Sequence, residues 1–401
     1  MTFCKRCVYP ENHPLGLTFD AQGVCSGCRV HEEKTTLNWE ERYKKLESLV
    51  AGFKNTSGQN YDCVVPVSGA RDSYFIVDTV LKLGLRPLLV TYNKHYNTEV
   101  GIRNLAYLRS LMGVDLMTQT VDPATVKKIT KVTLKKNGSM YWHVLAGQTV
   151  FPVQVAVRFK IPLIIWGAHQ GIDQVGMFSH TDEVEMTRKY RKDHDLMGYE
   201  AEDLIGEEGL TQRDLELFKY PHDKEIEKVG VRGIYLGNYI PWDTKAQHEE
   251  MIKAYGYETL EQTRTFDTYN DVDCFHYSDI HDYIKFVKWG YGKASDHASR
   301  EIRWGRLTRE EGIELVKKYE HTEPKTLQLF LDWLGMSRKE FDALIEKCRG
   351  TYDSVINHAK DAGVDAVRLD TKEGCEFVMT PSKAKTADKQ TYTLIGRGWV
   401  D

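Results

Sequence analysis

Apolar and polar positions along the chain follow a pattern typical of a parallel β-sheet protein. Short apolar runs rich in β-branched residues predict strands over 61–67, 87–92, 114–119, 161–166 and 231–236. Between them, apolar positions recur at helical spacing over 72–83, 99–111 and 149–159. Strands that are apolar on both faces and alternate with helices predict an α/β fold with a doubly wound parallel sheet.

The segments before and after this pattern differ from it in residue composition and in the spacing of apolar positions. Residues 1–37 carry cysteines and turn residues with little periodicity, and Asn38 is placed to cap a helix over 38–50. After about residue 242 the strand pattern mostly stops, and Thr308 with Glu311 and Ser337 with Glu340 form capping boxes that open helices. We therefore expect a zinc-binding segment (1–37), a sheet domain (38–245) and a mostly helical region (246–401).

Four of the eight cysteines form two CxxC pairs near the amino terminus, namely Cys4, Cys7, Cys25 and Cys28. Two such pairs supply the tetrahedral thiolate set that Zn²⁺ prefers, and four thiolates leave no open position for a catalytic water. A redox dithiol or plain buried cysteines are the alternatives, but a redox CxxC usually precedes a helix in a βαβ setting, which is missing here. A structural zinc site is the prediction.

The first predicted strand runs into a short polar loop, SGARDS, followed by an apolar helix. A strand that turns tightly into a helix directs backbone N–H groups and the helix dipole at one point, where an anion can bind. Gly69 permits close approach of a ligand, Ser68 and Ser73 can donate to phosphate oxygens, and Asp72 can hold Mg²⁺. The alternative is an ordinary polar turn.

Composition narrows the function classes. The chain has 401 residues, with 54 Lys and Arg against 58 Asp and Glu, a net charge of -4. The chain thus has no excess of basic residues to bind a nucleic-acid backbone, so we expect no nucleic-acid partner. No apolar segment follows Lys5 and Arg6, and the run 161–166 is too short to span a bilayer, so we expect no membrane span and a cytoplasmic location.

The SGARDS loop resembles the PP-loop of ATP pyrophosphatases, whose usual form is SGGxDS. It differs at Ala70, which stands in place of the second glycine and puts normal ATP affinity in question. The wider chain resembles the N-acetyl sugar amidotransferases of surface-polysaccharide synthesis, which are related to the pseudaminic acid amidotransferases. That resemblance rests on FCKRC with GVC, on LVTYN with GIRNL, on PLIIWG, and above all on GYGKASDHASREIR at 290–303.

The resemblance implies a PP-loop fold of the adenine nucleotide alpha hydrolase type and a reaction that uses ATP and Mg²⁺. The acetamido oxygen of a nucleotide-linked N-acetyl sugar, UDP-linked by expectation, attacks the α-phosphorus. Ammonia then displaces AMP and leaves an acetamidino group. Because the chain carries no recognisable glutaminase signature, the resemblance also implies separate glutaminase and cyclase-like subunits, similar to the histidine-pathway pair, as ammonia suppliers.

Candidate residues follow from the motifs and the resemblance together. For catalysis we name Asp72, Lys293, His297 and Arg303. For ATP we name Ser68, Gly69, Ala70, Arg71, Asp72 and Ser73, with Tyr92 and Asn93 at the end of the second strand near adenine. For the sugar nucleotide we name His169, His180, Arg188, Arg191 and Arg300.

Simpler roles compete with each assignment. The 290–303 run could be a solvated, salt-bridged helix, His297 a hydrogen-bonded helix histidine, and the basic run 188–192 a surface loop. Two alternative functions also stay open. One is a tRNA-modifying PP-loop enzyme, and the other is a non-catalytic scaffold whose altered loop binds ATP poorly.

Overall fold

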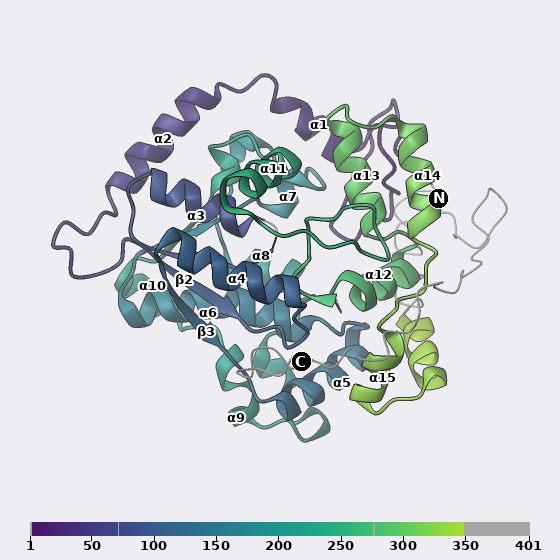
Figure 1. Ribbon diagram of the computed structural model, residues 1–401. Helices are drawn as coiled ribbons and strands as arrows, with labels where there is room; N and C mark the ends of the chain where they lie inside the picture. The colour runs from purple at the N-terminus through teal and green to yellow at the C-terminus, as the bar shows by residue number, and fades with distance from the viewer. Residues whose placement is uncertain (1, 71, 276, 349–401) are drawn as a thin grey trace.

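The computed structural model describes residues 2–70, 72–275 and 277–348, and it is built around one parallel sheet (Figure 1). The strands are β1 (Cys63–Pro66), β2 (Pro87–Tyr92), β3 (Asp115–Gln119), β4 (Leu163–Trp166) and β5 (Arg232–Tyr235). Their order is β3-β2-β1-β4-β5, and every pair is parallel. Val64 in the central strand pairs with Leu88 on one side and Ile164 on the other. All five predicted strands are confirmed.

Helices cover both faces of the sheet. On one face lie α3 (Ser73–Lys82), α4 (Glu99–Met112) and α11 (Thr244–Tyr255), and on the other lies α6 (Trp142–Phe159), with α5 (Pro123–Asn137) packed on it. Successive residues of β1 point to opposite sides, so Val65 joins the apolar core under α3 while Val64 joins the core under α6. Because both faces are buried, the doubly wound arrangement is confirmed.

Two helices differ from the prediction. The α6 helix begins at Trp142 rather than near residue 149, and it is apolar almost all round because the sheet and α5 cover it. The α5 helix was not predicted, although Asp122 caps it by accepting a hydrogen bond from the Thr125 N–H and Pro123 is its first residue.

The amino-terminal segment contains α1 (Ser26–Glu33) and α2 (Trp39–Ala51), and the Asn38 side chain caps α2 as predicted. It runs beside two helices from the other end of the chain (Figure 1), where the Arg303 guanidinium reaches Cys25 and the Arg309 guanidinium reaches the carbonyl oxygens of Cys4 and Cys7. The described carboxy-terminal helices are α12 (Asp282–Trp289), α13 (Lys293–Arg303), α14 (Arg309–Tyr319), α15 (Leu327–Leu334) and a last one over 338–348.

Both predicted capping boxes are present. The Thr308 hydroxyl accepts from the Glu311 N–H at the start of α14, and the Ser337 hydroxyl accepts from the Glu340 N–H before the last helix. Short helices fill the connections around β4 and β5, namely α7 (Gln170–Asp173), α8 (Arg188–Tyr190), α9 (Gln212–Leu215) and α10 (Asp223–Val229). No helix in the described part of the chain combines the length and the apolar character needed to cross a bilayer.

Candidate active site

The loop after β1 has the shape that anion-binding loops require. Gly69 adopts a left-handed φ of 79°, and a Cβ there would lie 2.9 Å from the carbonyl oxygen of Gly101 and from the backbone nitrogen of Leu105. Only glycine fits this position without strain. Ala70 is not left-handed, so its methyl group causes no backbone strain. Arg71 lies outside the described residues.

Two serine hydroxyls hold the loop in this shape. Ser73 Oγ accepts from the Ser68 N–H at 3.0 Å and donates to the Ala70 carbonyl at 2.8 Å, while Ser68 Oγ accepts from the Ala70 N–H at 3.3 Å. Asp72 occupies the N-cap position of α3, but its side chain makes no capping hydrogen bond to that helix. The hydroxyls therefore shape the loop, and capping does not occupy the Asp72 carboxylate.

A cavity of about 260 Å³, the loop cavity, lies between this loop and the ends of β4 and β5. Its walls include Ser68 and Asp72 after β1, Trp166 and His169 at the end of β4, and Tyr92 at the end of β2. In the order β3-β2-β1-β4-β5 the chain reverses direction across the sheet between β1 and β4. Ligands of doubly wound sheets bind in the crevice at such a point, outside the carboxyl ends of the strands.

Three buried nitrogen atoms of residues that line the loop cavity have no hydrogen-bond partner among the described residues: Trp166 Nε1, His169 Nε2 and Arg191 Nη2. Burial lowers the pKa of His169 to about 4, and its Nδ1 accepts from the Gly171 N–H at 3.1 Å, so the ring proton of the neutral form sits on Nε2. Arg191 Nη1 donates to Glu200 at 2.8 and 2.9 Å, which fixes the guanidinium. The cavity thus offers three hydrogen-bond donors.

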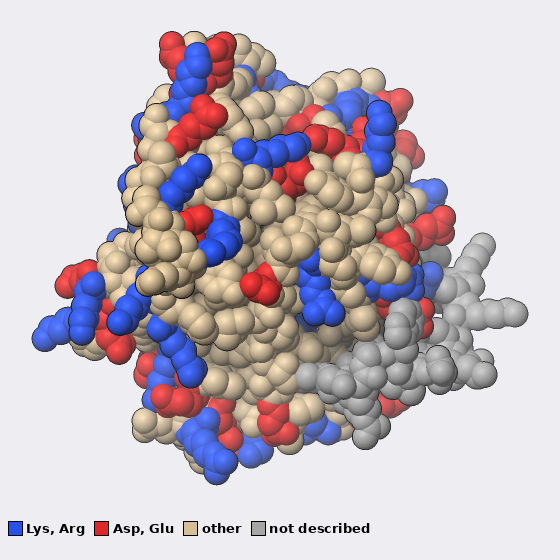
Figure 2. All heavy atoms as spheres, turned by 60° about the vertical axis from the view of Figure 1, so that its left-hand side comes forward, with Lys and Arg blue, Asp and Glu red and all other residues tan. Residues whose placement is uncertain are grey.

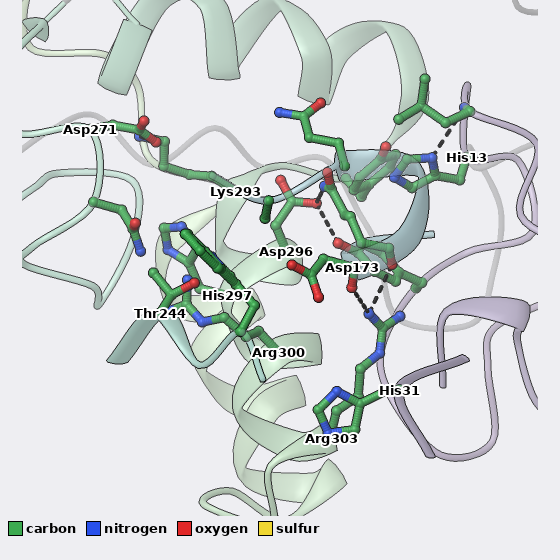
Figure 3. A pocket seen from close by; sticks show the side chains of 18 of the residues that line it. His13, His31, Asp173, Thr244, Asp271, Lys293, Asp296, His297, Arg300 and Arg303 are labelled. Atoms are coloured by element: carbon green, nitrogen blue, oxygen red, sulfur yellow. Dashed lines mark hydrogen bonds and ion pairs between the residues drawn. The ribbon is translucent and has the colours of Figure 1, made fainter. Parts of the chain in front are cut away.

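A second cavity of about 320 Å³, the α13 cavity, adjoins the first, and the linings of both include Asp72, Ala168 and Gln170. Figure 3 shows its two sides, with Lys293, Asp296, His297, Arg300 and Arg303 from α13 and with His13 and His31 from the amino-terminal segment. Asp72 therefore stands at the junction between the phosphate-type loop and the α13 helix.

The α13 helix is not a solvated helix. Lys293, His297 and Glu301 are each about 95% buried, with exposed fractions of 5%, 6% and 4%. Cationic side chains of the helix are paired with carboxylates: Arg300 Nη2 lies 2.7 Å from Asp267 Oδ2, and Lys293 Nζ lies 3.5 Å from Asp271 Oδ2. The simpler interpretation of this run as a solvated, salt-bridged helix is wrong in one respect: the salt bridges are present, but the helix is buried. Its acidic partners Asp267 and Asp271 come from a loop that packs over it.

Two groups of α13 have strongly shifted protonation equilibria. Burial lowers the pKa of His297 to about 4, so its imidazole is neutral at pH 7, and its Nδ1 lies 2.7 Å from the Thr265 hydroxyl. Burial would raise the pKa of Asp296, but Lys285 at 2.5 Å outweighs it and holds the pKa at about 2. The lining of the cavity thus includes a neutral imidazole and an ionised carboxylate.

The four amino-terminal cysteines form one buried cluster in which all Sγ atoms lie within 4.8 Å of one another. The Sγ atoms of Cys4 and Cys28 are 4.0 Å apart, and those of Cys7 and Cys25 are 3.6 Å apart. Thiolates held 2.3 Å from a tetrahedral Zn²⁺ lie about 3.8 Å from one another. Backbone N–H groups of Arg6, Cys7 and Cys25 donate to Cys4 Sγ, as metal-binding knuckles do. The cluster fits zinc.

Comparison with known proteins finds a similarity on the α13 side of the site. Residues 263–360 match the family described as "LPS biosynthesis protein WbpG-like, C-terminal domain". This WbpG-like segment covers less than half of the chain and includes α12 to α15. Most of the carboxy-terminal side of the α13 cavity, from Asn270 to Trp304, belongs to it.

No curated protein sequence matches this chain. Among solved structures, NMN synthetase from Francisella tularensis matches 56% of this chain and 98% of its own, at 12% identity and a TM-score of 0.27. The NH3-dependent NAD synthetase from Campylobacter jejuni, solved with nitrate ion, matches 56% and 100% at 14% identity and a TM-score of 0.27.

Several residues named from the sequence lie elsewhere. The imidazole of His180 is buried 3.1 Å from Glu33, and Asn93 accepts from the His95 N–H within its own loop. Arg188 is half-exposed and pairs with Asp223 at 3.3 Å. None of the three belongs to the described lining of either cavity.

The structure also adds residues that sequence reasoning missed. Lys34 bridges Asp173 at 2.7 Å and the Trp242 carbonyl at 2.8 Å, and it lines the α13 cavity opposite the WbpG-like segment. Trp166 could have been found from its place at the carboxyl end of a predicted strand. No local pattern in the sequence marks Lys34.

Proposed function

We propose that this protein is an ATP-dependent amidotransferase of O-antigen or other surface-polysaccharide biosynthesis. It adenylates the acetamido group of a nucleotide-linked N-acetyl sugar and substitutes ammonia, which yields an acetamidino group, AMP and pyrophosphate. One observation carries the proposal: a phosphate-type loop and a WbpG-like segment line two cavities that share Asp72, Ala168 and Gln170.

In this proposal ATP occupies the loop cavity. Backbone N–H groups of the loop and the start of α3 bind the phosphates, as helix N-termini bind anions. The donors of Trp166, His169 and Arg191 bind acceptor atoms on the opposite side of the nucleotide. The Asp72 carboxylate is an oxygen ligand of the kind Mg²⁺ prefers, and a bound Mg²⁺ would neutralise phosphate charge.

The acetamido group occupies the α13 cavity, next to the α-phosphorus. Its carbonyl oxygen forms a bond to phosphorus while the bond to pyrophosphate breaks, giving an O-adenylyl imidate that is protonated because it keeps the amide N–H proton. An amide oxygen is a poor leaving group, whereas AMP is a good one, so this step makes the later displacement possible. Lys293 and Arg300 supply positive charge near the transferring group.

Ammonia then adds to the imidate carbon, AMP departs with the former carbonyl oxygen, and the nitrogen loses a proton. His297 is the residue we propose as acceptor of that proton, because its imidazole is neutral at pH 7. The nucleophile in this step is ammonia, because an ammonium ion has no lone pair and would have to lose a proton before it could attack. We propose that separate glutaminase and cyclase-like subunits supply ammonia, and ammonium chloride can replace them in a test.

The test is pyrophosphate release from ATP in the presence of Mg²⁺, ammonium chloride and a panel of UDP-linked N-acetyl sugars. Mass spectrometry then identifies any sugar in which NH has replaced oxygen. Pyrophosphate and an amidine product from one sugar would support the proposal and identify the substrate.

Two controls separate the alternatives. Release with tRNA but with no sugar would overturn the sugar assignment in favour of a base-modifying enzyme. Failure to bind ATP would favour a scaffold whose Ala70 loop is inactive. The face in Figure 2, where acidic and basic side chains are interspersed, gives no support to a nucleic-acid substrate.

A further inference from the structure

Two arginines of the WbpG-like segment reach the four-cysteine cluster from outside. Arg303, at the end of α13, directs Nη2 at Cys25 Sγ over 3.7 Å. Arg309, at the start of α14, donates from Nε to the carbonyl oxygens of Cys4 and Cys7 at 3.0 and 3.1 Å. The cluster is thus tied to two helices that lie 278 to 305 residues away in the sequence.

Arg303 is held firmly in this position. Its Nη1 donates to the carbonyl oxygens of Asp173 and Gln174 at 3.1 and 2.8 Å, and its guanidinium carbon lies 5.2 Å from the ring centre of Tyr9. A Cβ at Gly27, inside the second CxxC pair, would lie 2.2 Å from Arg303 Nη2 and 2.6 Å from the Gln174 carbonyl oxygen. Gly27 therefore makes room both for the arginine and for the carbonyl group that it binds.

The two arginines compensate for the negative charge of the metal-loaded cluster. One Zn²⁺ held by four thiolates carries two net negative charges, and a buried charge is costly unless a partner compensates for it. All four cysteines are at most 1% exposed. Arg303 and Arg309 supply two positive charges beside the cluster. Donors to metal-bound thiolates also adjust the electron density on sulfur.

We propose that Arg303 is a positioning residue that couples the metal in the four-cysteine cluster to the wall of the α13 cavity. Its N–H donates to the metal-bound thiolate of Cys25, and the same guanidinium fixes the end of α13 against the carbonyl oxygens of α7. The sequence suggested Arg303 as a cation for the transition state. Instead, both terminal nitrogens of its guanidinium are engaged by the protein, and the buried Nε has no hydrogen-bond partner among the described residues.

The test uses the full chain with Co²⁺ in the cluster, because thiolate-to-cobalt charge transfer reports on hydrogen bonds to sulfur. Arg303→Met removes the only side-chain donor that the described residues direct at Cys25 Sγ, so the charge-transfer band moves to longer wavelength. Arg309→Met is the matched control, because Arg309 touches carbonyl oxygens and no sulfur, and its band stays in place.

A second readout is zinc affinity, measured by competition with a chromophoric chelator. Loss of an outer hydrogen bond to a metal ligand weakens binding roughly 10- to 100-fold, which is the change expected for Arg303→Met. If that variant does not fold, Arg303→Lys keeps the positive charge but is too short to place a nitrogen where Nη2 meets Cys25 Sγ, and the same band shift is expected. Spectra and affinities equal to wild type in Arg303→Met, or in Arg303→Lys where that variant is needed, would overturn the proposal. Neither readout depends on which molecule the α13 cavity takes.

Discussion

Replacing Glu320 by glutamine should make the protein more stable at neutral and alkaline pH. Glu320 follows α14 and is 2% exposed. Its Oε1 accepts from the backbone N–H groups of Gly292 and Ser295, both at 2.7 Å, at the start of α13. Burial, with Asp282 nearby, raises the pKa of Glu320 to about 7 from 4.5. The carboxylate form is thus disfavoured in the fold.

The sign and size of the effect follow from this pKa. A carboxyl that binds its proton more tightly in the folded state stabilises the fold at low pH, and that contribution is lost as the pH rises from 4.5 through about 7. At 1.36 kcal/mol per pKa unit, the loss amounts to roughly 3 kcal/mol by pH 8. Glutamine keeps an oxygen acceptor for both N–H groups and never ionises, so Glu320→Gln avoids the loss.

The assay is urea unfolding of both proteins at intervals from pH 4 to pH 8. The two free energies of unfolding should nearly coincide at pH 4 and diverge to roughly 3 kcal/mol at pH 8, with the variant more stable. Glu310→Gln, at an exposed position of α14, is the control and should follow wild type. Parallel curves for wild type and Glu320→Gln would refute the reasoning, because they would mean that Glu320 titrates alike in both states.

Three further predictions concern the loop cavity. Gly69→Ala forces a left-handed alanine, at a cost of about 1–2 kcal/mol, and should weaken ATP binding in calorimetric titration, while Ala70→Gly should leave it nearly unchanged. Trp166→Phe removes one N–H donor and keeps the aromatic ring, so ATP affinity should fall by about 1 kcal/mol, and an unchanged Kd would contradict this role. Asp195 lines the loop cavity, and burial raises its pKa to about 7. Its carboxylate form would repel the phosphates, so ATP affinity should fall as the pH rises through 7, and Asp195→Asn should abolish this pH dependence in the same titration.

The strands and the cluster could be predicted because their signals are local. Each strand is a short apolar run buried on both faces, and each CxxC pair places two thiolates within one turn. The α6 helix was predicted too short because it is buried on all sides, and a helix buried on all sides shows no amphipathic stripe in its sequence. Its first turns, up to Gly147, where the Tyr92 ring packs, therefore carried no signal. The loop, a local motif, was placed correctly on its strand and helix.

The electrostatics of the site could not be predicted in the same way. The cationic residues of the 290–303 run are evident from the sequence. The carboxylates that pair with them lie in a loop about 20 to 30 residues earlier, where Asp267 pairs with Arg300 and Asp271 with Lys293. The partner of Arg303 is Cys25, at the far end of the chain. A spacing rule finds neighbours on one helix, whereas these contacts exist only once the fold has formed.

The resulting charge balance bears on the kind of group the α13 cavity can accept. Among the described residues of its lining, five side chains are cationic (Lys34, Lys285, Lys293, Arg300 and Arg303) and five are acidic (Asp72, Asp173, Asp271, Asp282 and Asp296). A cavity built to enclose a diphosphate would carry an excess of cations, as phosphate sites do. A balanced one suits an uncharged acetamido group and uncharged ammonia, since neither leaves a net charge buried. In the proposed reaction the diphosphate of the sugar nucleotide would therefore lie outside this cavity, with only the acetamido end reaching Asp72.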